Sequence, residues 1–254
     1  MQKTLLPLIA AAALLAPALQ ASAAGTSTLS FQQGLNGYAG TQDAHIRSNE
    51  TSGGDSRNTN YGALASLSID GDDGSPGAKP NQGLIRFEHL FGSAAGQIKA
   101  SDTIVSATLK LNVFDPGSGF TVHRLLSDWS QAKVTWNSLG NGVQLNGVEA
   151  EAAVLASFGA NNGNANVSNG WLSIDLTQSL ITQQGQAQAA FGWLLTPYLA
   201  GTNGVDFHSS ESSSAALRPL LEVNVVSSVP EPQAWLLMAG GLLALVNLKR
   251  SRKA

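Results

Sequence analysis

The sequence predicts an all-β chain: an antiparallel β-sandwich or jelly roll, with a signal helix before it and a short hydrophobic helix after it. Apolar and polar residues alternate over 104–113, which is the pattern of a strand with one buried face. The turn sequence Asp115-Pro116-Gly117 follows and returns the chain into an antiparallel neighbour. Roughly ten such short segments, separated by loop residues, are typical of a sandwich.

The same two patterns, alternation and loop composition, place the other elements. In 63–70 we expect Ala65, Leu67 and Ile69 to point inward, and we expect Trp193 to lie in the core because its strand is nearly all apolar. Leu180 and Ile181 show helical spacing, so 177–188 is the one expected helix of the body. The expected strands are 43–47, 63–70, 84–89, 104–113, 120–124, 151–158, 171–176, 189–196, 205–209 and 217–226.

The first 23 residues form a secretory signal. Lys3 supplies the positive end, residues 5–19 are apolar, and Ala21-Ser22-Ala23 is a small-residue cleavage site. The chain has no cysteine, so the exported body, residues 24–228, depends on its core and not on disulfides. That body carries nine basic and sixteen acidic residues without a basic cluster, which argues against nucleic acid as a partner.

The last 26 residues, 229–254, form a sorting tail. Pro230-Glu231-Pro232 is followed by an apolar run of about 14 residues, shorter than the ~20 of a membrane-spanning helix. Basic residues then end the chain, as expected of a cytoplasmic flank. This order resembles the PEP-CTERM sorting signal of Gram-negative bacteria. The resemblance implies recognition by an exosortase-type sorting enzyme, transient anchoring in the inner membrane, and a final place at the cell surface or outside the cell. A plain membrane anchor is the alternative.

An ordered set of short motifs spans residues 40–226. They include Asp43-Ala44-His45-Ile46-Arg47, Gly83-Leu84-Ile85-Arg86-Phe87-Glu88, Ser127-Asp128-Trp129 and Arg218-Pro219-Leu220-Leu221-Glu222-Val223. The set resembles the DNRLRE domain, which implies a carbohydrate-binding-module-like jelly roll; some members of that family bind acidic polysaccharide such as alginate, and many others are attached to larger extracellular enzymes. The chain departs from that pattern in Glu88, where the family often has Asp, and in a Gly-rich insert at 71–80.

Three residues are candidates for sugar binding. Arg86 and Arg124, together with Lys110, lie on polar strand faces, where a row of cations would meet the carboxylates of an acidic polysaccharide. The alternative is pairing with Glu88 and other acids of the chain. Trp171 begins an alternating strand on its polar side, where an exposed ring can stack on a sugar.

The acidic loop that contains Asp70, Asp72 and Asp73 is a candidate calcium site, because Ca²⁺ prefers several oxygen ligands. A solvated acidic turn is the alternative, and calcium would be the one cofactor.

The sequence contains few signs of a catalytic site. Asp206, His208 and Ser209 are sequential, and Ser209 would point away from His208 on a strand. The sequence therefore favours a non-catalytic surface or extracellular-matrix protein that binds exopolysaccharide. A structural biofilm protein without a sugar site and a polysaccharide-degrading enzyme are the alternatives.

Overall fold

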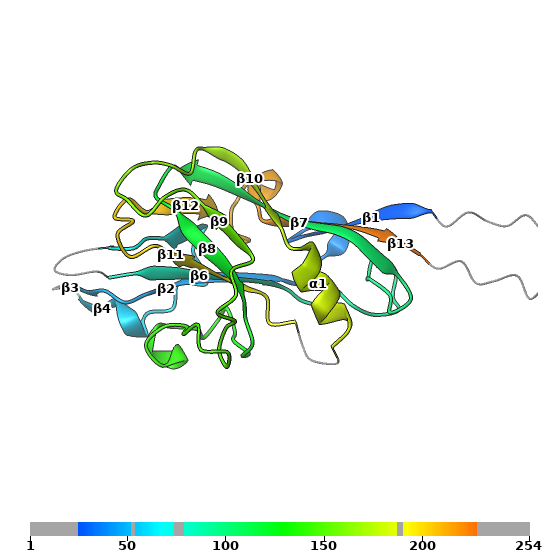
Figure 1. Ribbon diagram of the computed structural model, residues 1–254, viewed down its shortest axis with the longest axis horizontal. Helices are drawn as coiled ribbons and strands as arrows, with labels where there is room; N and C mark the ends of the chain where they lie inside the picture. The colour runs from blue at the N-terminus through cyan, green and yellow to red at the C-terminus, as the bar shows by residue number, and fades with distance from the viewer. Residues whose placement is uncertain (1–24, 52–53, 74–78, 187–189, 228–254) are drawn as a thin grey trace, which may run out of the picture. The chain divides into compact units, whose positions relative to one another are not determined.

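The computed structural model describes residues 25–51, 54–73, 79–186 and 190–227 (Figure 1). These residues belong to one compact unit, Gly25–Ser228. The predicted signal at 1–23 and the sorting tail at 229–254 lie outside the described residues, so both stay predictions. Within the described part of the chain, no helix is long and apolar enough to cross a membrane.

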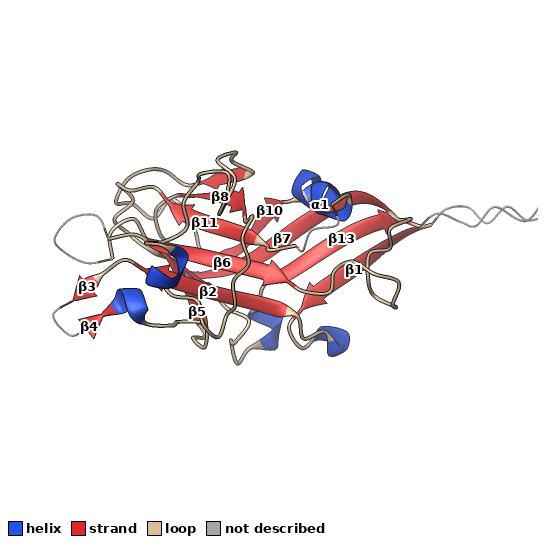
Figure 2. Ribbon diagram, turned by 90° about the horizontal axis from the view of Figure 1, so that it is seen from below, coloured by secondary structure: helices blue, strands red, loops and turns tan. Residues whose placement is uncertain are grey.

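Two antiparallel sheets confirm the predicted sandwich. Sheet A has the order β1-β13-β7-β12-β5, with β10 paired to the other side of β7, and Figure 2 shows β1, β13 and β7 side by side. Its strands are β1 (Thr26–Gln32), β5 (Ser66–Ile69), β7 (Thr103–Asp115), β10 (Gly170–Asp175), β12 (Val205–His208) and β13 (Leu220–Val226).

Sheet B has the order β2-β6-β11-β8-β9. Its strands are β2 (Thr41–Arg47), β6 (Asn81–Phe87), β8 (Phe120–Arg124), β9 (Ala156–Phe158) and β11 (Trp193–Pro197). The other elements are the hairpin β3 (Glu50–Thr51) and β4 (Gly54–Asp55), the helix α1 (Thr177–Gln184), and short 3₁₀ turns at Leu35–Gly37, Ser56–Asn58, Asn137–Leu139 and Ala215–Leu217.

The main core lies between the two sheets. In β7, Ala107, Leu109, Leu111 and Val113 are all buried, as the alternation predicts. At the start of β7 the phase is the reverse of the prediction: Ile104 is buried and Val105 is 54% exposed. The cause is a bulge, since Ile104 pairs with Val225 and Ser106 with Asn224, which leaves Val105 unpaired.

A second core covers the outer face of sheet B. Ala44, Ile46, Leu84 and Leu194 point outward from three neighbouring strands and are buried. They pack under Trp129, Val134 and Val143, which belong to the long connection after β8, the green loop below β2 and β6 in Figure 1. Every residue of β6 is consequently buried, so the prediction of a solvent-exposed face for this strand is wrong.

Four other predicted features differ in how well they match the structure. Trp193 is fully buried, as predicted, and the expected helix is present as α1. Leu67 and Ile69 are buried, but Ala65 precedes β5 and is exposed. The strand expected at 151–158 shortens to β9. Residues 151–155 lie beside β8, where Glu151 N donates to Arg124 O and Leu155 N to Val122 O, but they form a loop and not a regular strand.

Candidate functional site

The connection after β8 is closed at its base and contributes residues to the candidate site. Leu125 and Ala150 form an antiparallel bridge, and Leu126 N donates to Glu149 O at 2.8 Å. We call residues 126–149 the covering loop. Trp129 anchors it: its ring is buried, and its Nε1 donates to Phe191 O at 2.9 Å. The loop is thus fixed to the segment that enters β11.

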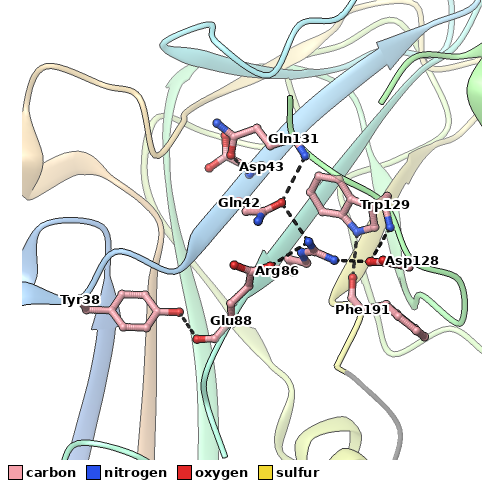
Figure 3. Close-up of polar contacts among 9 residues, drawn as sticks. All are labelled: Tyr38, Gln42, Asp43, Arg86, Glu88, Asp128, Trp129, Gln131 and Phe191. Carbon is pink, nitrogen blue, oxygen red and sulfur yellow. Dashed lines mark hydrogen bonds and ion pairs between the residues drawn. The ribbon is translucent and has the colours of Figure 1, made fainter. Parts of the chain in front are cut away.

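Arg86 is the centre of the site (Figure 3). It points outward from β6 directly opposite Gln42 of β2, and its guanidinium lies 5.2 Å from the ring centre of Trp129. One guanidinium nitrogen donates to Asp128 Oδ1 at 2.6 Å; the other donates to Glu88 Oε1 at 2.8 Å and Gln42 Oε1 at 3.1 Å. Arg86 therefore joins two strands to the covering loop.

A cleft of about 670 Å³ opens beside this cluster. We call it the Arg86 cleft. It is lined by polar side chains and by the aromatic Phe91 and Phe191, and its full lining is Arg86, Phe87, Glu88, His89, Leu90, Phe91, Asp128, Gln183, Gln184, Gln186, Ala190 and Phe191. Carboxylates, amides and aromatic rings are the groups that bind sugar hydroxyls and sugar rings.

A second cleft of about 550 Å³ lies on the other side of Gln42. Gln42 Oε1 accepts from Arg86 on one side and from the backbone N–H of Gln131 on the other, so one amide forms the partition. The second cleft is lined by Thr41, Gln42, Asn60, Gly62, Ala63, Ser130, Gln131, Ala132 and Glu211.

Asp43 supports the second cleft from beneath. Its carboxylate is buried and accepts from the backbone N–H of Ser210 at 2.7 Å, next to Glu211. Burial raises the pKa of Asp43 to about 7, while the bonds from Ser210 oppose this rise and the charge of Glu211 adds to it. Burial likewise raises the pKa of Tyr38, whose hydroxyl donates to Glu88 O.

Arg86, Arg124 and Lys110, the predicted row of cations, lie on three different surfaces. Arg86 faces outward from sheet B; Arg124 points from the inner face of the same sheet at its end; Lys110 lies on sheet A. Arg124 pairs with Glu151 and Lys110 with Glu222. The predicted row of cations is therefore wrong, and the alternative, pairing with acids of the chain, is confirmed.

Trp171 lies on the outer face of sheet A and is 49% exposed, as its position predicts. It pairs with Asn112 of β7, and Phe114, two residues further along the same face, is also exposed and contacts His208 with ring centres 4.8 Å apart.

The acidic loop is held by bonds within the chain. Asp73 pairs with Arg47 at 3.1 Å and accepts from Asn81 Nδ2, and Asp70 accepts from the N–H of Asp72. Among the described residues, no group of three or more His, Cys, Asp or Glu side chains is arranged to hold a metal ion. Calcium at Asp70, Asp72 and Asp73 stays a prediction, and a lower melting temperature in EDTA is the result that would support it.

The sequence did not single out Gln42, Asp128 or Phe191 as binding residues. Asp128 belongs to the Ser127-Asp128-Trp129 motif, which is the one signal that could have drawn attention to it. Ser209 Oγ donates to Leu64 O at 2.6 Å, and the hydroxyl that lies 3.4 Å from His208 Nδ1 is that of Ser212.

Comparison with known families supports a sugar-binding module. The model of Carbohydrate-binding module family 96 matches residues 36–224, which include all of sheet B, the covering loop and every strand of sheet A except β1 and the end of β13. No curated protein matches the chain. Since the match extends over most of the sequence, the chain belongs to carbohydrate-binding module family 96.

Proposed function

We propose that the body of this chain is an exported, non-catalytic module that binds extracellular polysaccharide in the Arg86 cleft. The family match supports binding of carbohydrate. The cleft combines hydrogen-bonding groups with an aromatic wall, and the observation that carries the proposal is Phe191 beside the Arg86 cluster. An aromatic ring next to planar polar side chains is suited to one face of a sugar and its hydroxyls.

The test is retention of residues 24–228 on immobilised polysaccharides, with Phe191→Ala as the cleft variant. The substitution removes the aromatic wall but keeps the backbone oxygen that Trp129 needs. We expect at least about a tenfold loss of affinity, the ~1.4 kcal/mol scale of a lost aromatic contact. Phe158→Ala is the control, because Phe158 is also partly buried but lies outside the cleft.

Trp171 is a rival binding position. Its exposed ring on the open face of sheet A would stack on a glycan without any cleft. Loss of retention in Trp171→Ala, with Phe191→Ala unchanged, would move the binding site to that face. If neither the wild type nor any variant is retained on any glycan, the structural role without a sugar site replaces this proposal.

A polysaccharide-degrading enzyme is the second candidate function, because Glu88 and Asp128 both reach the same cleft. Glycoside hydrolysis needs one carboxyl group that holds a proton and one that does not. Here both carboxylates accept hydrogen bonds from the same guanidinium, so neither is distinguished as the proton donor. New reducing ends, lost in Glu88→Gln, would establish the enzyme.

The tail completes the proposal. The Pro230-Glu231-Pro232 motif, the apolar run and the basic end support export followed by sorting through an exosortase-type enzyme, with transient anchoring in the inner membrane. The protein would then act at the cell surface or in the extracellular matrix, where exopolysaccharide is the ligand at hand.

A further inference from the structure

We propose that β1 pairs edge to edge with the β1 of a second copy of this chain, so that sheet A continues across a two-fold axis. The inference goes beyond the proposed function, because it concerns association of the chain with itself and does not depend on glycan binding. It follows from the way in which the edge strands of the two sheets are protected or left open.

β1 leaves one edge of sheet A open. It is the first strand of that sheet and pairs with β13 alone, in an unbroken register from Thr26↔Val226 to Gln32↔Leu220 (Figure 2). Alternate residues of such a strand direct their N–H and C=O groups away from their one neighbour. Within the part of the chain that the structure describes, no segment other than β13 forms a backbone hydrogen bond with β1. The outer edge of β1 is therefore available to a further strand.

The other edge strands of the two sheets are protected in ways that β1 is not. In β2, the N–H of Thr41 donates to Gln33 Oε1 at 3.3 Å. The N–H of Asp43 in the same strand donates to Gln131 Oε1 at 2.9 Å. β5 has four residues and β9 has three, and β10 carries the charge of Asp175. Short strands, edge charges and covering groups prevent strand pairing between molecules, whereas β1 has seven residues, none of them charged and none of them proline.

The sequence of β1 is complementary to itself. An antiparallel pair centred on Leu29 sets this residue against its own copy, and Thr28 against Ser30 of the second copy. Apolar pairs and hydroxyl pairs are favourable across two strands, and like charges directly opposite each other are unfavourable. Leu29 is half-buried and packs against the main core, so its copy would cover the side that is still exposed.

The absence of charge favours a second copy as the partner. The exported body carries nine basic and sixteen acidic residues, so two copies repel each other wherever their acidic surfaces meet. β1 contributes nothing to that repulsion.

A cleft of about 410 Å³ gives the incoming strand room. All four residues from Thr28 to Phe31 line it, so it follows the edge of β1 and not one face of the sheet. The cleft separates this edge from the loop Ala94–Gln97 and from Tyr38. Among its lining residues, His89 is the one that can carry a charge near neutral pH.

Pairing would join two bodies through one continuous sheet. If each body binds glycan in its Arg86 cleft, the pair holds a polymer at two places and is released more slowly than one body. This consequence rests on the proposed function, whereas the pairing itself does not.

Sedimentation equilibrium of residues 24–228, from about 1 µM to about 1 mM, measures the association. We expect the mass to rise from one copy toward two. Thr28→Lys/Ser30→Lys sets lysine against lysine on both sides of the axis, so it should weaken association at least about tenfold. The matched control is Ser168→Lys/Ser173→Lys, which adds the same charge at exposed positions in and before β10 and should associate at least as strongly as the wild type. Circular dichroism checks that each variant is folded.

A single cysteine tests the register without added charge, because the chain has no cysteine of its own. Leu29→Cys places two thiols opposite each other, with Cα atoms about 4.5–5.5 Å apart, which a disulfide can span. Ser27→Cys is the control, since its two copies would lie four residues apart along the pair, about 13 Å. We expect mild oxidation to give a covalent dimer with Leu29→Cys and not with Ser27→Cys.

The outcomes separate self-association from glycan binding. A wild type that stays monomeric over the whole concentration range, or equal association of the two lysine variants, overturns the pairing. Equal cross-linking of Leu29→Cys and Ser27→Cys also overturns it, because random collision would explain both. A monomer that is retained on polysaccharide leaves the proposed function intact, and a dimer that is retained on none overturns that function but not the pairing.

Discussion

Arg86 organises the candidate site although its own side chain is mostly buried. Its guanidinium stacks near Trp129 and links Gln42, Glu88 and Asp128. Arginine suits this position because its planar fork can donate in several directions at once. A lysine would offer one point charge and could not maintain the same three contacts.

We expect Arg86→Ala to lower the free energy of unfolding by about 2–4 kcal/mol, because it removes the shared partner of three groups around a mostly buried position. Urea denaturation of residues 24–228 measures the change. Lys110→Ala is the control: it breaks the half-exposed pair with Glu222, which should contribute less than about 1 kcal/mol. Equal losses in the two variants would show that Arg86 has no special structural role.

Asp43 should make stability depend on pH. Its pKa is raised from near 4 to about 7 in the folded chain, so between these values the folded state holds a proton that the unfolded state releases. This contribution is fully present below pH ~4 and is lost as the pH rises through ~7. Burial lowers the pKa of His45 to about 3, and this group has the opposite effect below pH ~6.5.

The comparison of wild type with Asp43→Asn isolates the first effect. We expect the stability of the wild type relative to Asp43→Asn to fall by a few kcal/mol, roughly, between pH 5 and pH 8. Melting curves at several pH values measure this difference. Parallel curves for the two proteins would mean that Asp43 does not titrate in this range.

The sequence predicted the burial of single residues better than it predicted which residues contact one another. Trp193 and Trp171 were placed correctly because each strand's own pattern decides which face a residue occupies. Gln42, Asp128 and Phe191 meet Arg86 only through the pairing of β2 with β6 and the path of the covering loop. Such contacts depend on long-range pairing, which no local period encodes.

At the scale of the elements, the covering loop explains why the strand predicted at 84–89 is buried on both faces and not on one. The alternation in 84–89 correctly separates Ile85 and Phe87 from Leu84 and Arg86, but both sets are buried. A loop rich in Gly and Asn gave no periodic signal of a second layer, although its Trp129, Val134 and Val143 supply one. The alternation of apolar and polar residues shows that a strand has two different faces. It does not show whether another segment of the chain covers the polar face.

Gly62 is where this loop meets the segment before β5. A Cβ at Gly62 would lie 2.2 Å from Gln131 O, a backbone atom that cannot move alone. Gln131 Nε2 also donates to Gly62 O at 2.7 Å. We expect Gly62→Ala to cost about 1–3 kcal/mol and to weaken glycan retention by displacing the loop.

Gly185→Ala is the matched control for that variant, since the nearest atoms to its added Cβ lie 3.8 Å away. Calorimetry together with the retention assay measures both effects. Retention that survives in Gly62→Ala would separate the second cleft from glycan binding.

For the whole molecule, the ends and the body have separate tasks. We expect alanines in place of Pro230-Glu231-Pro232 to leave the protein in the inner membrane, because the apolar run would persist without the motif that directs its processing. Cell fractionation and immunoblotting measure this, with Gln233→Ala as the control that keeps the motif. Normal release of the alanine variant would contradict the sorting assignment.

The three-layer arrangement of β6 and the covering loop has a consequence for opening motions. β6 lies between the main core and the second core, so its amides should exchange with solvent only when the whole sandwich unfolds. The covering loop has a closed base, but between residues 126 and 149 it contains a 3₁₀ turn and no strand, so it should open at a lower free energy than the sheets. Opening of the covering loop would separate Asp128 from Arg86, so the Arg86 cleft would be lost while both sheets remain folded. A chain that has lost its cleft can thus still be folded, and a melting curve by itself does not report whether the site is intact.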